Sequence, residues 1–372
     1  MPRTRDPDED NLDTTPPPQP VFYAEQALLG ALLLEPWRLD DVAGIGPEAF
    51  SSAAHAAVFA AIRSLPAPDP AQHARNTRWL EAVLTAAREQ ARGLTASHLH
   101  TLIQVCPWPR HAPAYARMIE AEHARRRLRT AAQRLAQTAQ DASLPHPVPT
   151  ALAAVDALAA VVDNVAAKFP PHSDSLPRTP APPPAPLPHD EEAADEERLL
   201  LATATAHPGD AEQMRWLNAK DFTHPLHAGL WQCLTALTRR RAPVDPVTVL
   251  WEAQQRGLLN TGADPRDLLN LLAGTVGSPQ HWGERILQRS LLATAHHTGR
   301  HIEVLTDDPA TTPSQLVVGS RRALADLSAL RTRWHHASTP TPPARPARTK
   351  AMAAPRAGPP QTTAAPASRI SR

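Results

Sequence analysis

The sequence predicts an all-α protein that contains two copies of one helical domain. Alanine and leucine dominate the stretches between proline clusters, and only 14 glycines occur in 372 residues, a composition that favours helices over strands. Apolar residues recur at the three- and four-residue spacing of a helix face. A set of landmarks also recurs in order, displaced by 172 residues, which indicates an internal tandem repeat. The landmarks are Glu25, Leu29, Pro36, Phe50, His55, Phe59, Ile62 and Leu65, matched by Glu197, Leu201, Pro208, Phe222, His227, Trp231, Leu234 and Leu237.

Proline and charge mark the expected joints between segments. The leader, the linker and the tail lack the apolar residues that a core requires, so we expect them to be unstructured. The expected segments are an acidic, proline-rich leader at 1–21, a first helical domain at 22–166, a proline-rich linker at 167–192, a second helical domain at 193–334 and a basic, proline- and alanine-rich tail at 335–372.

In the first repeat the expected helices follow the apolar spacing. The first helix stops before Pro36, because proline interrupts a helix. Two longer helices close the repeat as a hairpin. In order, the expected helical segments are 25–34, a short one at 40–43, one around 58–65, one around 79–84, one around 99–103, and the hairpin helices 112–139 and 149–165.

The second repeat has the same order, with small shifts of register. Thr312, Pro313 and Gln315 form a typical helix start, with an N-cap, a first-turn proline and a glutamine three residues on. The expected helical segments are one around 230–237, one around 247–253, one around 268–272, and the hairpin helices 280–305 and 313–334.

We expect the two hairpins to carry the interaction surface. A pair of antiparallel helices with an exposed apolar seam is a natural association surface. The hairpins are expected to pair with each other, within one chain or between two copies as a homodimer. The residues expected on the seams are Tyr115, Ile119, Leu128, Leu135, Leu152, Val155, Trp282, Ile286, Leu316, Leu324, Leu327 and Leu330.

The charge distribution points to weak nucleic-acid binding at one end. The net charge is +1, so no field of the whole molecule attracts nucleic acid. After Asp326 the chain has no acidic residue, and we expect its basic tail to bind DNA weakly and without sequence preference. The cluster from Arg125 to Arg129 is interpreted mainly as a charged outer face. The expected tail contacts are Arg345, Arg348, Lys350 and Arg356.

No catalytic residue, cofactor or metal site is predicted. His55 and His227 each precede a core helix, and we interpret them as capping or packed histidines. Cys106 and Cys233 stand at non-equivalent positions, which supports neither a disulfide nor a zinc site. The acidic run 190–197 is interpreted as a solvated helix start. The longest apolar run, 27–34, is too short to span a bilayer, so no membrane partner is expected.

Several motifs resemble the N-terminal domain of DnaB-type replicative DNA helicases. In the first repeat these are Glu-Gln-Ala-Leu-Leu-Gly-Ala-Leu-Leu-Leu-Glu-Pro at 25–36, Glu48 with Phe50, His55 before a helix, and Tyr-Ala-Arg-Met-Ile-Glu from residue 115. The second repeat preserves other parts, namely Lys-Asp-Phe at 220–222, His-Pro-Leu-His at 224–227 and the Pro-Val-Asp-Pro-Val-Thr stretch at 243–248. The resemblance covers nearly everything outside the leader, the linker and the tail.

The resemblance implies a helical bundle that ends in a helical hairpin. In such a family the hairpins of two copies pair, the pairs build the collar of a hexameric helicase, and the collar contacts primase. A nucleotide-binding Gly-x-x-x-x-Gly-Lys-Ser/Thr loop cannot be written around any of the three lysines. We therefore expect no ATPase activity, and instead a cytoplasmic, bacterial protein, with nucleoid association allowed, that serves as a collar or adaptor for a helicase, primase or loader. Two alternatives stay open: an accessory subunit of a helicase whose motor is on another chain, and a nucleic-acid-binding regulator that acts through the basic tail.

Overall fold

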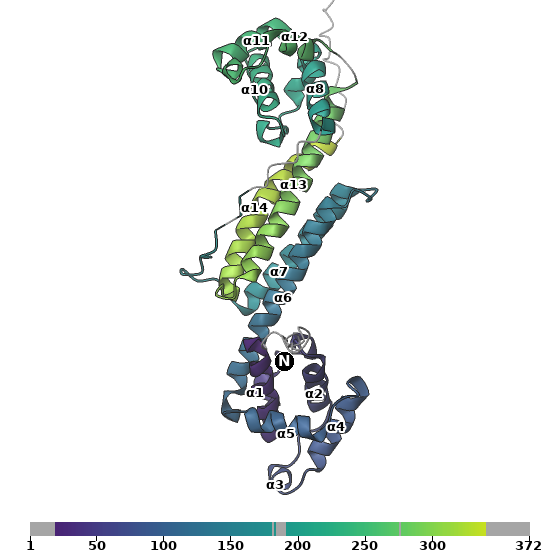
Figure 1. Cartoon of the computed structure of the whole chain (residues 1–372), viewed down its shortest axis with the longest axis vertical. Coiled ribbons are helices and arrows are strands. Elements are labelled where there is room, and N and C mark those ends of the chain that lie inside the picture. Colours follow the sequence, from purple (N-terminus) through teal and green to yellow (C-terminus); the bar gives the residue numbers. More distant parts are fainter. Residues whose placement is uncertain (1–18, 181, 184–190, 275–276, 340–372) are drawn as a thin grey trace, which may run out of the picture. The chain divides into compact units, whose positions relative to one another are not determined.

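The computed structural model describes residues 19–180, 182–183, 191–274 and 277–339. Within these ranges the secondary structure consists of helices and contains no strand, which confirms the all-α prediction (Figure 1). The first 18 residues of the expected leader, residues 184–190 of the linker and the tail from residue 340 lie outside the described residues.

The first head, as we call the small helical domain of the first repeat, is built around α1. Leu28, Leu29, Leu32 and Leu33 of this helix are buried, and the helix ends at Leu34, just before Pro36. The short helix expected at 40–43 is instead part of a longer 3₁₀ segment that begins at Pro36. The elements of this head are α1 (Pro20–Leu34), η2 (Pro36–Val42), η3 (Pro47–Ala49), α2 (Ala53–Ser64), α3 (Pro70–His73), α4 (Arg78–Gln90), α5 (Ala96–Val105) and η4 (Pro109–His111).

The second head repeats this plan around Trp231, whose side chain is 2% exposed. Asp245 begins its helix with a capping box, because the Asp245 carboxylate accepts from the backbone of Thr248 and the Thr248 hydroxyl faces the Asp245 backbone. The elements are α8 (Glu191–Ala206), α9 (Pro208–Gln213), η5 (Ala219–Asp221), α10 (Pro225–Arg239), α11 (Pro246–Gln255), η6 (Leu258–Thr261) and α12 (Pro265–Ala273).

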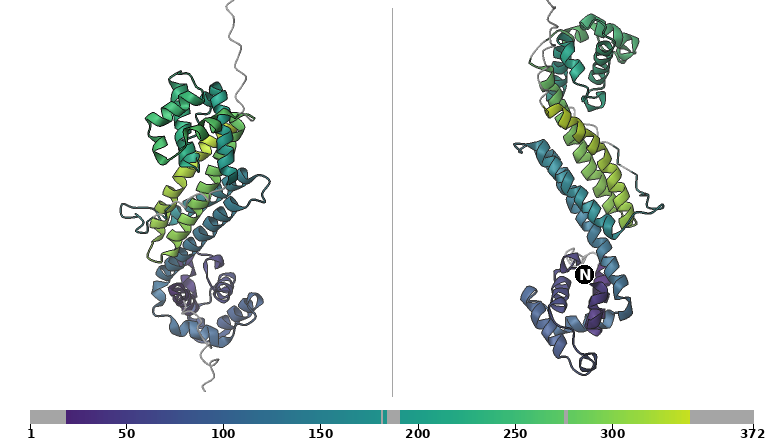
Figure 2. Two further views of the ribbon diagram at one scale, coloured as in Figure 1. Left: turned by 45° about the horizontal axis from the view of Figure 1, so that its top comes forward. Right: turned by 180° about the vertical axis from the view of Figure 1, so that it is seen from behind.

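Each repeat closes with a hairpin of two long helices. The first hairpin consists of α6 (Ala112–Gln140) and α7 (Pro147–Lys168), and the second of α13 (Pro279–Asp307) and α14 (Pro313–Ser338). The two hairpins lie side by side in both views of Figure 2 and share one apolar core. The structure therefore contains a four-helix bundle to which both repeats contribute two helices.

Part of the expected linker has a defined position on the second hairpin. The ring of Phe169 is buried and lies 4.5 Å from the guanidinium carbon of Arg117. The side chain of Gln315 donates to the carbonyl of Leu176 at 3.0 Å, and the hydroxyl of Thr179 donates to Asp308 at 2.7 Å. These contacts depart from the expectation of an unstructured segment, because this stretch bonds to the second hairpin and Pro177 lies beside Gly319 of α14.

Among the described residues, α7 is the one helix long and apolar enough to cross a membrane, by length and composition alone. Its apolar face, including Leu158 and Val162, is buried in the four-helix bundle. Its polar face carries Asp156 and Asp163, which pair with arginines of α14. This arrangement is that of a core helix in a helical bundle.

Candidate interaction site

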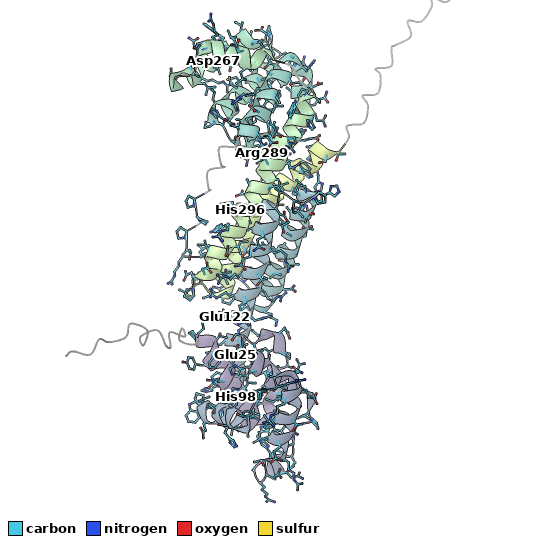
Figure 3. The ribbon with its side chains drawn as sticks, turned by 45° about the vertical axis from the view of Figure 1, so that its right-hand side comes forward. Glu25, His98, Glu122, Asp267, Arg289 and His296 are labelled. Carbon is cyan, nitrogen blue, oxygen red and sulfur yellow. The ribbon has the colours of Figure 1, made fainter. Side chains whose placement is uncertain are left out.

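A buried carboxylate and histidine join the first two helices of the first head. Glu25 is 0% exposed and His55 is 1% exposed, and the Glu25 carboxylate lies 2.7 Å from Nδ1 of His55. The backbone N–H of Ser51 donates to the second oxygen of the carboxylate. Burial raises the pKa of Glu25, but these hydrogen bonds outweigh it and hold the pKa below its ordinary value. Figure 3 labels Glu25 within this head.

The second head contains the same pair. Glu197 on α8 lies 2.8 Å from Nδ1 of His227 on α10. The Glu197 carboxylate also accepts from the backbone N–H and the hydroxyl of Thr223 and from the backbone N–H of His224. Its pKa is lowered like that of Glu25, because the same hydrogen bonds oppose the effect of burial. The same Glu–His pair therefore occurs in both heads, where it joins α1 to the start of α2 and α8 to the start of α10.

Both histidines are buried in the heads, as expected of packed residues. Their partners, Glu25 and Glu197, are the first pair of equivalent positions in the repeat, for which no role was predicted. Glu and His stand 30 residues apart in both repeats, and the repetition of this spacing is the signal that could have found the pair. Among the described residues there is no group of three or more His, Cys, Asp or Glu side chains that could hold a metal ion.

The acidic run in the first turns of α8 is not wholly solvated. Glu196 is 5% exposed and accepts from Arg285 at 2.8 Å and from Arg289, both of α13. Arg289 is labelled in Figure 3. The expectation of a solvated helix start is wrong for Glu196 and for Glu197, because both carboxylates are buried and bond to residues outside their own helix.

The contact between the hairpins depends on a close approach of α6 and α13. At Gly299 an added Cβ would lie 2.7 Å from the carbonyl oxygen of Ala132 and 2.9 Å from Cβ of Ala136. Only glycine permits this separation of the helices. Around it the bundle core is aliphatic, with Leu128, Leu135, Val155, Leu158, Val162, Ile302, Leu305, Leu316 and Leu327 as its large members.

Arg125 of α6 holds the turn between α13 and α14. Its guanidinium donates to four carbonyl oxygens, those of Thr306, Asp308, Pro309 and Thr311, at distances from 2.7 to 3.4 Å. These carbonyls lie in the last turn of α13 and in the turn that follows it, where no further N–H of the helix is available to donate to them. The side chain of one repeat thus caps a helix of the other.

The rest of the arginine cluster is divided between structure and solvent. Arg126 donates to the carbonyl of Ala49 at 2.6 Å, and Arg129 pairs with Asp307 at 2.9 Å. Arg127 is exposed. The interpretation as a charged outer face is therefore wrong for Arg125 and Arg126, because their guanidinium groups reach backbone carbonyls that the sequence spacing does not reveal.

Polar pairs close the edge of the bundle. Arg321 pairs with Asp163 at 2.9 Å, and Arg331 with Asp156 at 3.1 Å through one of its two contacts. These pairs are largely exposed, so each adds little to stability, on the order of 0.5 kcal/mol. They fix which faces of α7 and α14 meet.

The predicted seam residues fall into three groups. The first turns of α6 and α13 pack into the head cores, which places Tyr115 and Ile119 in the first head and Trp282 and Ile286 in the second. Leu330, near the end of α14, also packs into the core of the second head. Leu152 packs with Val148 and Leu291 at one side of the bundle. The bundle core itself contains Leu128, Leu135, Val155, Leu316, Leu324 and Leu327. The predicted DNA contacts Arg345, Arg348, Lys350 and Arg356 lie outside the described residues.

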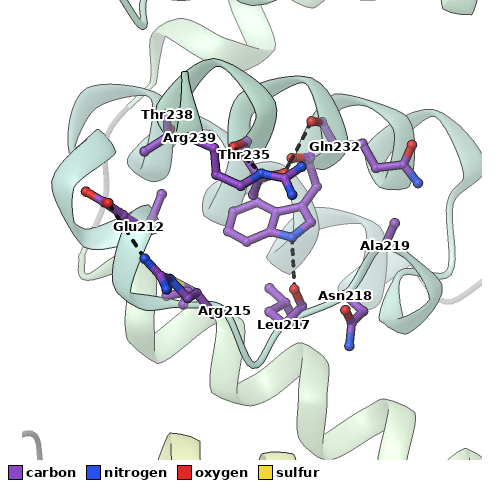
Figure 4. A pocket seen from close by; sticks show the side chains of 12 residues that line it. Glu212, Arg215, Leu217, Asn218, Ala219, Gln232, Thr235, Thr238 and Arg239 are labelled. Carbon is purple, nitrogen blue, oxygen red and sulfur yellow. Dashed lines mark hydrogen bonds and ion pairs between the residues drawn. The ribbon is translucent and has the colours of Figure 1, made fainter. Parts of the chain in front are cut away.

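The second head also has a groove of about 600 Å³ beside α10, shown in Figure 4. Trp231 forms part of its wall and donates from its indole N–H to the carbonyl of Leu217 at 3.3 Å. In the first head the corresponding carbonyl, of Ile45, accepts from Arg63, and the counterpart of Arg63 in the second repeat is Thr235. The groove is therefore open where the first repeat fills the space with its own arginine.

The duplicated heads match a known family model. The model of the DnaB-like helicase N-terminal domain matches residues 17–121 and, a second time, residues 187–284. Together these segments make up more than half of the chain.

The chain belongs to the DnaB-like helicase N-terminal domain family.

It carries this domain in two tandem copies and is related to replicative DNA helicases. No curated protein and no solved structure gave a significant match in the comparisons.

The family match ends in the first turns of the long helices. Residue 121 lies within α6 and residue 284 within α13. The matched segments thus correspond to the two heads, and the greater part of the hairpins lies beyond them. The hairpins are equivalent because each follows its head with the same two-helix arrangement.

Proposed function

We propose that the chain is a non-catalytic adaptor of the DNA replication machinery that binds a replicative helicase, a primase or a helicase loader. The observation that supports this most is that the hairpins of the two DnaB-like domains share one apolar core within a single chain. Two domains held together in this way offer a partner two related surfaces with little loss of conformational freedom on binding. The cytoplasm of a bacterium is the compartment in which we expect this work.

The seam residues are used within the chain, so partners must bind elsewhere. Leu128, Leu135 and Leu316 are 0% exposed, and a partner could reach them only if the bundle opened. The second head offers an exposed alternative on α11, where Val247 and Trp251 stand one turn apart and are 66% and 60% exposed. Exposed tryptophan beside an aliphatic residue is typical of protein contacts. We place the partner contact on this face.

Affinity purification from a nuclease-treated lysate of the host tests the proposal. Tagged chain is expected to retain helicase, primase or loader, identified by mass spectrometry, and the Val247→Ala/Trp251→Ala variant is expected to retain at least about tenfold less. A matched control is Trp37→Ala/Trp108→Ala, which removes two exposed tryptophans from the first head. Retention of none of the three replication proteins by the unmodified chain would overturn the proposal.

The accessory-subunit alternative differs in its consequence for the motor. If the chain completes a helicase whose motor is on another chain, adding it to that helicase should change the rate of ATP hydrolysis. An adaptor is expected to change which proteins are bound together while the rate of the isolated motor stays the same.

A further inference from the structure

A buried carboxylate joins the second head to its own hairpin. Asp221, at the end of η5, is 2% exposed. Its carboxylate accepts from the hydroxyl of Ser290 on α13 at 2.9 Å and from both terminal nitrogens of Arg333 on α14, at 2.5 and 3.0 Å. Arg333 also donates to the carbonyl of Trp216 at 3.1 Å. The charge of Asp221 is therefore surrounded by donors from both helices of the hairpin.

The first repeat has alanine at the position of this carboxylate. Ala49 ends η3 as Asp221 ends η5, at the displacement of 172 residues. The helices α6 and α13 begin at residues 112 and 279, a displacement of 167, so the counterpart of Ser290 is His123. A side chain that can donate a hydrogen bond is thus kept on α6, while the carboxylate that accepts it in the second repeat is missing.

The cation at the end of the hairpin is kept as well. The ammonium of Lys168, at the end of α7, donates to the carbonyl of Gly44 at 3.3 Å. Gly44 corresponds to Trp216, whose carbonyl accepts from Arg333. Lys168 therefore takes the place of Arg333 in the first repeat.

The first repeat has a pocket where the second repeat has its carboxylate. The pocket measures about 90 Å³ and lies between the loop that contains η3 and the helices α6 and α7. Glu122, labelled in Figure 3, directly precedes one of its lining residues on α6. This volume suits a group of the size of phosphate and excludes a whole nucleotide. The lining includes Gly44, Ala49, His123 and Lys168, together with Arg127 of α6.

Positive charge prevails around His123. Partial burial of this side chain lowers the pKa of His123 below its ordinary value. The charges of Arg126 and Arg127, and to a smaller extent that of Lys168, lower it further. Glu48 acts in the opposite direction but does not cancel these charges. An anion in the pocket would therefore be attracted by its surroundings.

The two carboxylates at the pocket do not take the place of the missing one. Glu120 pairs with Lys168 at 2.9 Å, so these two charges compensate each other. Glu48 is exposed, and its carboxylate accepts no hydrogen bond from any other residue that the structure describes. Glu48 is therefore a competitor that an incoming anion can displace at little cost.

We propose that the pocket of the first repeat binds a small oxyanion, a phosphate group, in the position that the Asp221 carboxylate takes in the second repeat. Arg127 and Lys168 donate to its oxygens, and these two cations from different helices suit the charge and the several oxygens of phosphate better than those of a carboxylate. The bound group joins the first head to its hairpin, as Asp221 does in the second. The site does not depend on the adaptor role.

Isothermal titration calorimetry of the full chain with inorganic phosphate tests the proposal. We expect a dissociation constant of about 1 mM or below at low salt. Arg127→Gln should weaken binding by about tenfold, because a hydrogen bond to a charged group is lost. Arg134→Gln, at an exposed position of α6 outside the pocket, is the matched control and should bind like the unmodified chain. Glu48→Gln should strengthen binding, because the competing carboxylate is removed.

Ala49→Asp supplies an independent arm, because it restores in the first repeat the carboxylate of the second. This variant should no longer bind phosphate, since its own carboxylate occupies the pocket. In the unmodified chain, bound phosphate should raise the pKa of His123, which NMR titration of the ring measures. Adenosine monophosphate distinguishes a free ion from a phosphate group carried by a larger molecule, which alone would bind with similar affinity in this form.

Two results would overturn the proposal. One is the absence of phosphate binding by the unmodified chain. The other is binding that Arg127→Gln leaves unchanged, which would mean an adventitious ion on another basic part of the chain. If Ala49→Asp fails to fold, as circular dichroism would show, the comparison of Arg127→Gln with Arg134→Gln still decides.

Discussion

The carboxylate of Glu25 is buried, and hydrogen bonds from the protein take the place of water around it. The fold holds its pKa below the ordinary value of 4.5, as burial is outweighed by the hydrogen bonds from His55 and Ser51. A group with a lowered pKa stabilises the folded state above its unfolded pKa and loses this contribution as the pH falls through the folded pKa. Glu197 shifts in the same direction. Both heads should therefore lose stability below pH 4.5.

Replacing Glu25 by Gln should reveal this contribution directly. We expect Glu25→Gln to lower the free energy of unfolding of the first head by about 3 kcal/mol at neutral pH, because a buried partner of His55 is removed. The free energy of unfolding of this variant should also fall less between neutral and acidic pH than that of the unmodified chain. Urea denaturation at a series of pH values measures both effects. Glu89→Gln, at an exposed position of α4, is the control, and equal stability of the two variants would contradict the argument.

Arg125 is a single side chain that satisfies four carbonyls of the other repeat. Lysine at this position keeps the charge but lacks the planar fork of donors, so it cannot reach all four oxygens. We expect Arg125→Lys to cost about 2 kcal/mol in urea denaturation. Arg127→Lys, at the exposed position two residues on, should change stability by less than about 0.5 kcal/mol. Equal losses of stability in both variants would mean that the four hydrogen bonds of Arg125 do not stabilise the fold specifically.

At the scale of elements, the crossing of α6 and α13 rests on Gly299. An alanine there would place its Cβ 2.7 Å from the carbonyl oxygen of Ala132, so the two helices must separate. We expect Gly299→Ala to destabilise the protein by about 1 to 3 kcal/mol. Amide hydrogen exchange should become faster in both α6 and α13. Gly209→Ala is the matched control in α9, where an added Cβ meets nothing within 4 Å, and it should be neutral.

The helices were largely predictable, and the contacts between them were not. Apolar spacing and proline positions indicated both hairpins: the helix expected from residue 149 begins at Pro147, and the one expected from Pro313 begins there. The same spacing could not show that Ile119 closes a head core while Leu128, further along the same helix, belongs to the bundle. Both residues lie on the buried face of α6. Which core each of them packs into depends on the tertiary structure and cannot be read from their spacing.

Residues with polar side chains were the least predictable part of the site. Glu196 and Arg125 were interpreted as surface charges, because Glu196 stands among other acids at a helix start and Arg125 among other arginines with acids nearby. Their partners, Arg285 and the turn after α13, lie 89 and more than 180 residues away.

At the scale of the whole molecule, the tandem repeat places two domains that pair through their hairpins on one chain. Oligomers of a single domain must gather separate copies, so their pairing depends on concentration. Here the linker keeps the hairpins together at a high effective concentration, and the pairing persists at any dilution. This leaves the exposed faces of the heads, such as that of α11 with Val247 and Trp251, outside the hairpin contact.

If the bundle rather than the linker holds the repeats together, cutting the linker should not separate them. We would insert a specific protease site between residues 184 and 189 and cleave the purified chain. The two halves are expected to co-elute in gel filtration, because the shared core includes Leu327, which is 1% exposed. Leu327→Asp should release them by burying an unpaired charge, whereas Val247→Asp, at a position that is 66% exposed, should leave them bound. Separation of the halves without any substitution would show that the hairpin core is too weak to join the repeats, and the two repeats would then behave as independent domains.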